Sequence, residues 1–141
     1  MHINAAGLEL IKTFEGFSPT PYICPAGIRT IYYGHICRAW ESYDGTREQG
    51  EAYLRQDLTV AEDAVPRLIK VHLTENQFSA LVSFVFNLGS GSLQRSTLRS
   101  KLNRREYMSA SGEFEKWVYA AGKKLSGLVA RRECERKLFL S

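Results

Sequence analysis

The sequence predicts a mostly helical α+β fold with one small sheet near its N-terminus. Amphipathic helical segments recur along most of the chain, and strand-type residues with two prolines interrupt them between residues 17 and 35. The length of 141 residues suits one domain that can bury a core. Hydrophobic residues make up 44% and charged residues 24%, which is ordinary for a globular protein.

The first helix is expected over residues 5–15, where apolar side chains fall near one face and Gly16 supplies a stop. The clearest helix begins after Thr74, because Thr74 and Gln77 make a capping box. Its sequence NQFSALVSFVFNLG is apolar on nearly every side, so it should lie at the centre of the core and end at Gly89. The side chains expected to be buried in it are Phe78, Leu81, Val82, Val85 and Phe86.

Four further helices are expected from the pattern. They cover residues 47–70, capped by Thr46 and bent or broken near Pro66; a short segment from 96 or 97 to 102; residues 106–119; and residues 127–140. In the third of these, Phe114, Trp117 and Val118 should point inward. Residues 38–46 read as a loop.

The small sheet is expected in the segment that follows the first helix. Pro19 and Pro21 exclude a helix interior there. Strand-like residues at 22–23 and 28–33 flank a Pro-Ala-Gly reversal at 25–27. The pattern predicts a hairpin or small sheet with an exposed edge.

Cysteine usage and hydropathy restrict the class of protein. Cys24, Cys37 and Cys134 have no metal-binding spacing, so we expect no metal site and no structural disulfide. No apolar run approaches the roughly 20 residues that a membrane helix needs. The first residues do not resemble a secretory signal, so we expect synthesis in the cytoplasm and no stable membrane association.

The net charge of +4 favours an anionic partner, for which nucleic acid and bacterial cell wall are the two candidates. The basic residues concentrate in residues 122–141, which we interpret as a solvated helix face. The sequence has neither a recognition-helix motif nor an aromatic and basic strand platform, so nucleic-acid binding is the weaker candidate.

Glu15, Cys24 and Thr30 surround the tight reversal of the predicted sheet. Partial shielding from water favours the protonated form of a carboxylic acid, as a general acid requires. Thr30 offers a hydroxyl that can hold a water, and glycoside hydrolysis needs an acid on one side of the scissile bond and a water or nucleophile on the other. The spacing alone is a weak signal, and by itself it favours a solvated glutamate and a threonine chosen for its strand propensity.

Three segments carry a resemblance across nearly the whole chain: GLELIKTFEGF…PYICPAGIRTIYYGH, NQFSALVSFVFNLGSGSLQRSTLRSKLN and GLVARRECERKLF. In this order they resemble the phage endolysin-type lysozymes, glycoside hydrolase family 24, whose pattern is E-G followed by Y-x-D-x-x-G-x-x-T-I-G-Y-G-H. The resemblance implies one lysozyme domain over residues 1–141. Its sheet lobe would cover about 14–46, and its helical lobe about 70–141 plus the first helix. A long helix would join the lobes, with a cleft between them.

The activity implied by the resemblance is cleavage of the β-1,4 bond between N-acetylmuramic acid and N-acetylglucosamine in peptidoglycan. No cofactor is expected, and the protein should act as a monomer on the cell wall after a holin releases it. Glu15 takes the general-acid position, and Thr30 the position that helps hold the attacking water. Substrate contacts are expected from Tyr33, Phe86 and Asn87. Supporting roles fall to Arg131, which would pair with the catalytic glutamate, and to His35, which we interpret as structural.

Two residues depart from the family pattern. Cys24 stands at the position of the catalytic aspartate, so it is a thiolate or water-holding substitute, an inert small residue, or the mark of a protein that binds peptidoglycan without cleaving it. Tyr32 stands at the second glycine of T-I-G-Y-G-H. Its ring is therefore expected to point out of the packed face or to shift the strand.

Overall fold

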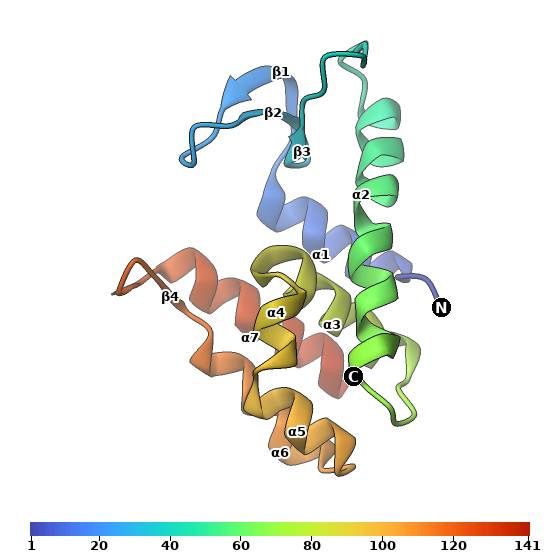
Figure 1. The fold of residues 1–141 in the computed structure, drawn as a ribbon, viewed down its shortest axis with the longest axis vertical. Coiled ribbons are helices and arrows are strands. Elements are labelled where there is room, and N and C mark those ends of the chain that lie inside the picture. The colour runs from blue at the N-terminus through green and yellow to red at the C-terminus, as the bar shows by residue number, and fades with distance from the viewer. The chain divides into compact units, whose positions relative to one another are not determined.

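The computed structural model describes all of residues 1–141. The chain forms two compact units. The sheet unit comprises Lys12–Thr59, and the helical unit comprises Met1–Ile11 with Val60–Ser141. The boundaries of the units fall within two helices, α1 (Ala5–Glu15) and α2 (Arg47–Leu68), which are labelled in Figure 1.

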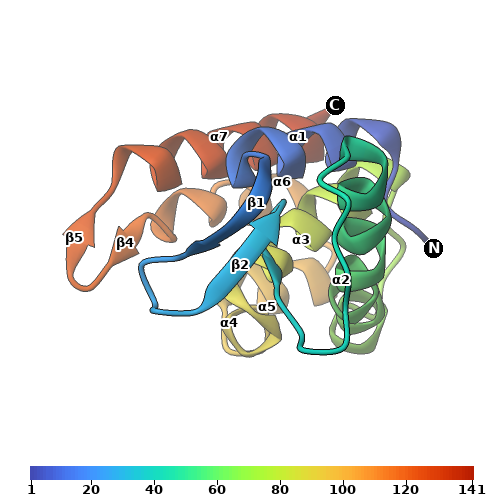
Figure 2. The same ribbon diagram turned by 90° about the horizontal axis from the view of Figure 1, so that it is seen from above.

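The sheet unit contains a three-stranded antiparallel sheet of order β1-β2-β3 (Figure 1), and Figure 2 shows β1 and β2 side by side. Its strands are β1 (Ser18–Ile23), β2 (Arg29–Tyr32) and the short β3 (His35–Ile36). The register places Tyr22 opposite Thr30 and Thr30 opposite Ile36. The predicted reversal is confirmed, and β3 is a strand that the sequence pattern did not indicate.

Helix α2 begins where the sequence predicts. The Thr46 hydroxyl accepts a hydrogen bond from the Gln49 N–H at 3.1 Å, which satisfies one of the free donors of the first turn. The helix ends at Leu68, two residues after Pro66. None of the helices is long and apolar enough to cross a membrane.

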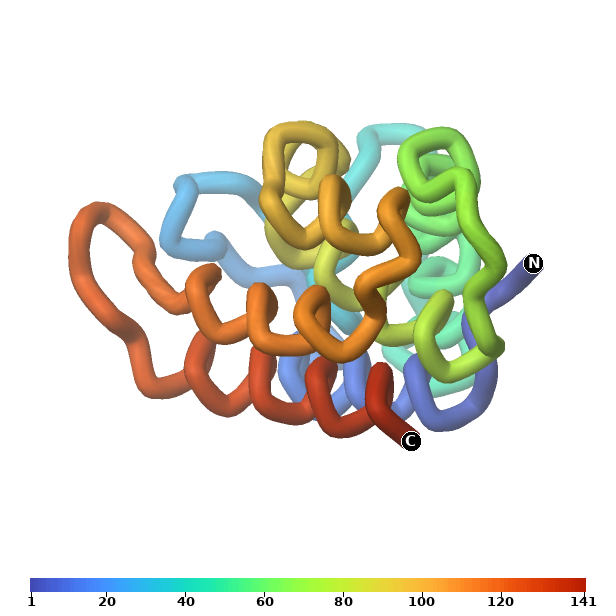
Figure 3. Tube along the Cα trace, turned by 90° about the horizontal axis from the view of Figure 1, so that it is seen from below, coloured from blue at the N-terminus to red at the C-terminus, as the bar shows by residue number.

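The helical unit is built around α3 (Glu75–Leu88), which packs along α7 (Ser126–Leu140). The predicted capping box is present, and the Gly89 N–H caps the other end by donating to the Val85 carbonyl at 2.7 Å. The prediction that Phe86 is buried is wrong, because it is half-exposed and Phe84 is the fully buried phenylalanine of that turn. Between α3 and α7 in the sequence come α4 (Ser90–Gln94), α5 (Thr97–Asn103) and α6 (Tyr107–Ser111), and the orange α6 lies beside the red α7 (Figure 3).

The expected helix over residues 106–119 is also wrong. Helix α6 ends at Ser111, a single 3-10 turn follows at Phe114–Lys116, and a hairpin of β4 (Tyr119–Ala120) and β5 (Lys123–Lys124) comes next. The hairpin turns through Ala121 at φ +50° and Gly122 at φ +77°. A two-residue hairpin turn of this type needs a left-handed backbone at both positions, so the alanine there hides the turn from a sequence reading.

Candidate active site

Glu15 is the last residue of α1, and its side chain is half-exposed. The turn between β2 and β3 comes directly against its carboxyl group at Gly34. A Cβ atom on Gly34 would lie 2.9 Å from Glu15 Oε1, and the backbone there is left-handed with φ +76°. Only glycine meets both conditions without strain, so the glycine of the Y-G-H sequence brings this turn close to the acid.

Cys24 and Thr30 meet inside the β1–β2 hairpin. The backbone closes there through a Gly27 N–H to Cys24 carbonyl bond of 2.8 Å and a Cys24 N–H to Ile28 carbonyl bond of 3.0 Å. Thr30 is only 5% exposed, and its hydroxyl lies 2.9 Å from the Ile28 carbonyl oxygen. The hairpin therefore places both side chains on the same face of the sheet.

The surroundings of the Cys24 sulfur favour a negative charge. The Ile28 N–H lowers the pKa of the Cys24 thiol, and the Ala26 N–H and the Thr30 hydroxyl add to this effect. Desolvation of the thiol opposes them but does not outweigh them. A thiol with a lowered pKa is present as thiolate to a larger extent near neutral pH. Of the three interpretations of Cys24, the environment of its sulfur is least suited to an inert small residue.

Tyr32 is fully buried at the end of β2, so the expectation that its ring points out of the packed face is wrong. Its backbone is left-handed, with φ +58°, a conformation that costs a tyrosine free energy. The ring stacks with Phe17 at 5.8 Å between centroids and occupies space opposite Gly50 in α2. A Cβ atom on Gly50 would lie 2.9 Å from the Phe17 ring and 3.2 Å from the Tyr32 ring, so the glycine in α2 leaves room for the tyrosine.

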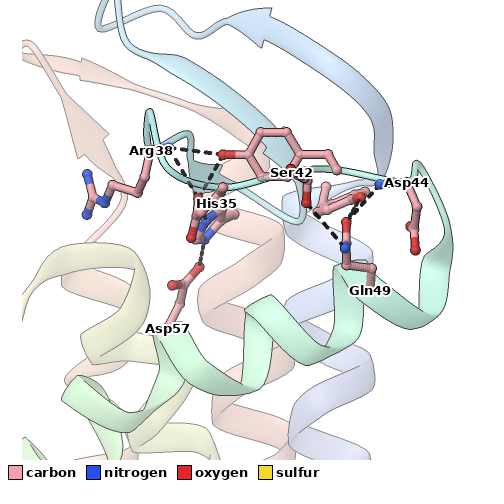
Figure 4. A network of polar contacts seen from close by, with 9 residues as sticks. His35, Arg38, Ser42, Asp44, Gln49 and Asp57 are labelled. Carbon is pink, nitrogen blue, oxygen red and sulfur yellow. Dashed lines mark hydrogen bonds and ion pairs between the residues drawn. The ribbon is translucent and has the colours of Figure 1, made fainter.

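The hydroxyl of Tyr32 ties the loop before α2 to the helix. It donates to Gln49 Oε1 and accepts the Gly45 N–H at 3.0 Å. Gln49 in turn accepts the Asp44 N–H at 3.0 Å, a contact drawn in Figure 4. Tyr32 stands where the family has a glycine, and its buried ring and hydroxyl group hold residues 42–46 in place.

His35 is held between two carboxylates of the sheet unit (Figure 4). Its Nδ1 lies 2.8 Å from Asp57 Oδ2 and its Nε2 lies 2.9 Å from Glu41 Oε1. Burial works against the charged imidazole, but the hydrogen bonds to Glu41 and Asp57 outweigh it and raise the pKa of His35. The ring also stacks on Tyr53 at 4.3 Å. All of these contacts fasten the loop after β3 to α2.

The pKa values of the two carboxylates beside His35 are shifted in opposite directions. Burial raises the pKa of Asp57 more than the histidine lowers it. Burial also acts to raise the pKa of Glu41, but hydrogen bonds from His35 and Tyr43 prevail and lower it. Tyr43 donates to Glu41 Oε1 at 2.7 Å and accepts the Arg38 N–H at 2.9 Å, which completes the network.

The remaining predicted site residues lie in both units. Tyr33 in the sheet unit is 5% exposed, and its ring tilts against Phe17. Phe86 and Asn87 are half-buried at the C-terminal end of α3. Arg131 is buried in α7, with Nε 3.4 Å from Glu135 Oε2.

Sequence reasoning missed a buried ionic network in the helical unit. Arg132 and Glu135, at 1% and 0% exposed, form an ion pair with Nε 2.7 Å from Oε1. Ser83 donates to Glu135 Oε2 at 2.6 Å. Burial raises the pKa of Glu135 and lowers that of Arg132, and the attraction between them opposes both shifts. The prediction that this basic helix presents only a solvated face is wrong for these residues.

The Phage lysozyme family model matches residues 12–135. The chain belongs to the phage lysozyme family. Its sequence is 44% identical over 145 residues to the endolysin of Acyrthosiphon pisum secondary endosymbiont phage 1, an alignment that covers all of this chain and 99% of that protein. The chain also aligns over its whole length with 55% of the endolysin of Bacillus phage B103, at 42% identity.

Two solved structures show the same lysozyme fold. The muramidase domain of SpmX from Asticaccaulis excentricus superposes with a TM-score of 0.90 at 38% identity, covering 100% of this chain and 99% of that one. A point mutant of P22 lysozyme superposes with a TM-score of 0.90 at 36% identity and the same coverage. The resemblance found in the sequence and the mostly helical α+β fold are both confirmed. Phage lysozymes are muramidase glycosidases that hydrolyse peptidoglycan in cell lysis, and this chain is an enzyme of that class.

Proposed function

We propose that Glu15, Cys24 and Thr30 form the catalytic site of a muramidase that cleaves the β-1,4 bond between N-acetylmuramic acid and N-acetylglucosamine. The observation that carries the proposal is the β1–β2 hairpin, which closes between Cys24 and Ile28 and places Cys24 and Thr30 on one face with the Ala26 and Ile28 N–H groups nearby. These donors lower the pKa of the thiol, so the thiolate can supply the negative charge of the missing aspartate. Glu15 lies in the same unit, where Gly34 brings the β2–β3 turn against its carboxyl group.

The reaction then proceeds as a single displacement. The Glu15 carboxyl group gives its proton to the glycosidic oxygen while the bond from that oxygen to the anomeric carbon breaks. A water held by the Thr30 hydroxyl and the Cys24 thiolate attacks the anomeric carbon from the opposite face, and its proton passes to the thiolate. The thiolate also stabilises the positive charge that develops on the sugar in the transition state. Attack from the opposite face inverts the anomeric configuration.

Phe86, Asn87 and Tyr33 are the substrate residues in this proposal. Asn87 and Phe86 are accessible at the end of α3 and can meet the glycan with an amide and an aromatic ring. Tyr33 would contribute through the small part of its ring that is exposed, and Arg131 would pair with the catalytic glutamate. Release through a holin and action as a monomer stay predictions.

Lysis of purified bacterial walls by Glu15→Gln tests the proposal. The amide keeps the size of the side chain but has no proton to donate, so the rate of turbidity loss should fall by on the order of a hundredfold or more. Glu48→Gln, an exposed change in the first turn of α2, is the matched control and should lyse walls like the parent. Equal lysis by Glu15→Gln and the parent would contradict the assignment.

The substitution of aspartate by Cys24 leaves one alternative, a protein that binds peptidoglycan and cleaves it weakly or not at all. Co-sedimentation with walls, measured beside turbidity, separates the two. The proposed muramidase sediments with walls and clears them, whereas a binding module sediments with walls and leaves their turbidity unchanged.

A further inference from the structure

Arg132 reaches from α7 to the end of α3 and contacts a predicted substrate residue. Its Nη2 donates to Asn87 Oδ1 at 2.7 Å. The same guanidinium group is held on its other sides by Glu135, with Nη2 3.2 Å from Oε2, and by the Trp117 carbonyl oxygen, 3.3 Å from Nη1. It also lies over the Phe84 ring at 5.3 Å. Arg132 is only 1% exposed, and these contacts hold its guanidinium group in one orientation.

This contact fixes which end of the Asn87 amide faces outward. A guanidinium group only donates hydrogen bonds, so the Asn87 atom facing Nη2 must be the carbonyl oxygen Oδ1. The Nδ2 group therefore points away from Arg132 and has no acceptor within the protein. Asn87 is half-buried rather than enclosed, so part of its surface at the end of α3 is open to a ligand.

We propose that Arg132 is a positioning residue that orients Asn87 so that its amide N–H groups donate to a carbonyl oxygen of bound peptidoglycan. The inference rests on the proposed function, which places Asn87 in contact with the glycan. Acetamido groups of the sugars and amides of the stem peptide both supply such an acceptor. A site built to donate a hydrogen bond discriminates against a ligand that lacks the acceptor, so Arg132 contributes to specificity through Asn87.

Binding rather than turnover gives the cleanest test, because it does not depend on Glu15 or Cys24. The dissociation constant of a soluble, peptide-free peptidoglycan glycan fragment is measured by calorimetry in the Glu15→Gln background. Asn87→Asp keeps an oxygen for Arg132 but has no N–H group, so binding should weaken about three- to tenfold while the unfolding midpoint does not fall. The same measurement is made with a peptide-bearing fragment, and binding of both fragments equal to that of the Glu15→Gln parent would overturn the donor role.

The action of Arg132 through Asn87 is tested by a double-mutant cycle. Arg132→Lys keeps the positive charge beside Glu135 but lacks the fork that reaches Asn87 and Trp117 together, so it should weaken binding by a similar factor. In the Asn87→Ala background the same change should have no further effect. Arg136→Lys is the control, since Arg136 lies on the same helix with its Nε 3.6 Å from Glu115, and it should bind like the parent.

Each outcome is decisive. Additive losses in the cycle would show that Arg132 acts independently of Asn87 and would overturn the inference; if Arg132→Lys fails to fold, Asn87→Asp alone decides. A glycan whose acetamido groups have been removed should bind more weakly than the acetylated one if the acetamido carbonyl is the acceptor. If only peptide-bearing fragments respond to Asn87→Asp, the acceptor is in the stem peptide.

A parent that binds no fragment would overturn the proposed function as well, whereas wall lysis with unchanged binding in Asn87→Asp would overturn this inference alone.

Discussion

Each unit of the molecule contains one buried polar network, and the two networks differ in how their contribution to stability changes with pH. In the sheet unit, His35 joins Asp57 and Glu41 and fastens the loop after β3 to α2. In the helical unit, Arg132 and Glu135 join α7 to the end of α3, through Ser83 and Asn87. Histidine changes its charge near neutral pH, whereas an arginine does not. The sheet unit, which carries the proposed catalytic residues, should therefore be the part that loosens first as pH rises.

The largest loss of stability is expected when the polar network of the helical unit is broken. Glu135→Met leaves the buried Arg132 without the carboxylate of its ion pair and should lower the free energy of unfolding by about 3–5 kcal/mol. Urea unfolding at pH 8 measures this loss. The double variant Arg132→Met with Glu135→Met removes both members of the pair and should be more stable than Glu135→Met alone. A loss below about 1 kcal/mol for Glu135→Met would mean that the network does not hold α7 to α3.

A smaller effect is expected from the aromatic cluster of the sheet unit. Tyr32→Gly restores the family's residue and relieves the left-handed backbone, but it empties the space between Phe17, Gly50 and Tyr53. The cavity should outweigh the relief, for a net loss of about 2–4 kcal/mol in the free energy of unfolding. Tyr32→Phe removes only the hydroxyl contacts to Gln49 and Gly45 and should cost about 1 kcal/mol. A glycine variant as stable as the parent would show that the tyrosine is tolerated rather than required.

The smallest loss of stability is expected when His35 is replaced, and this loss depends on pH. Its pKa is raised in the folded state, so its contribution is complete below the unfolded value of about 6.5 and is lost as pH rises through the folded value. The pKa of Glu41 is lowered, so its contribution is present above the unfolded value and is lost as pH falls through the folded one. The raised pKa of Asp57 opposes part of this gain.

His35→Gln should therefore cost about 1–2 kcal/mol between roughly pH 4.5 and 6.5 and less at pH 9, measured by urea unfolding at each pH. His72→Gln changes an exposed histidine and serves as the control. A loss that does not change with pH would break the comparison between the two networks, because it would show that His35 acts through packing on Tyr53 and not through charge.

Local signals were sufficient for much of the fold. The ends of α1 and α3 follow from Gly16 and from the Thr74 capping box, which act within one turn of the chain. The β4–β5 hairpin could not be predicted, because Ala121 adopts a left-handed backbone that its residue type does not indicate. The choice between Phe84 and Phe86 for the core depends on the rotation of α3 against α7, which the uniformly apolar sequence does not fix.

The candidate site divides in the same way. Glu15, Cys24 and Thr30 could be selected from a motif, because the hairpin that gathers Cys24 and Thr30 is local. The buried place of Tyr32 depends on Gly50, which is 18 residues away in another element. Arg132 and Glu135 looked like part of a solvated basic helix, because a sequence does not show which side of α7 faces α3. The missed features of the site therefore share one cause, which is that their partner residues are distant in sequence.

The central claim is that the Cys24 thiolate takes over the role of the aspartate, and the pH dependence of wall lysis tests it most directly. Lysis rates of the parent, Cys24→Asp and Cys24→Ser are compared from pH 5.5 to 8.5. Because all three share Glu15, the ratio of the parent's rate to that of Cys24→Asp isolates the titration of the thiol, and it should rise with pH as the thiolate forms. Cys24→Ser cannot ionise and should be slower than the parent by roughly tenfold or more at pH 8. A ratio that stays flat across this range, with serine and cysteine lysing walls at equal rates, would contradict the account.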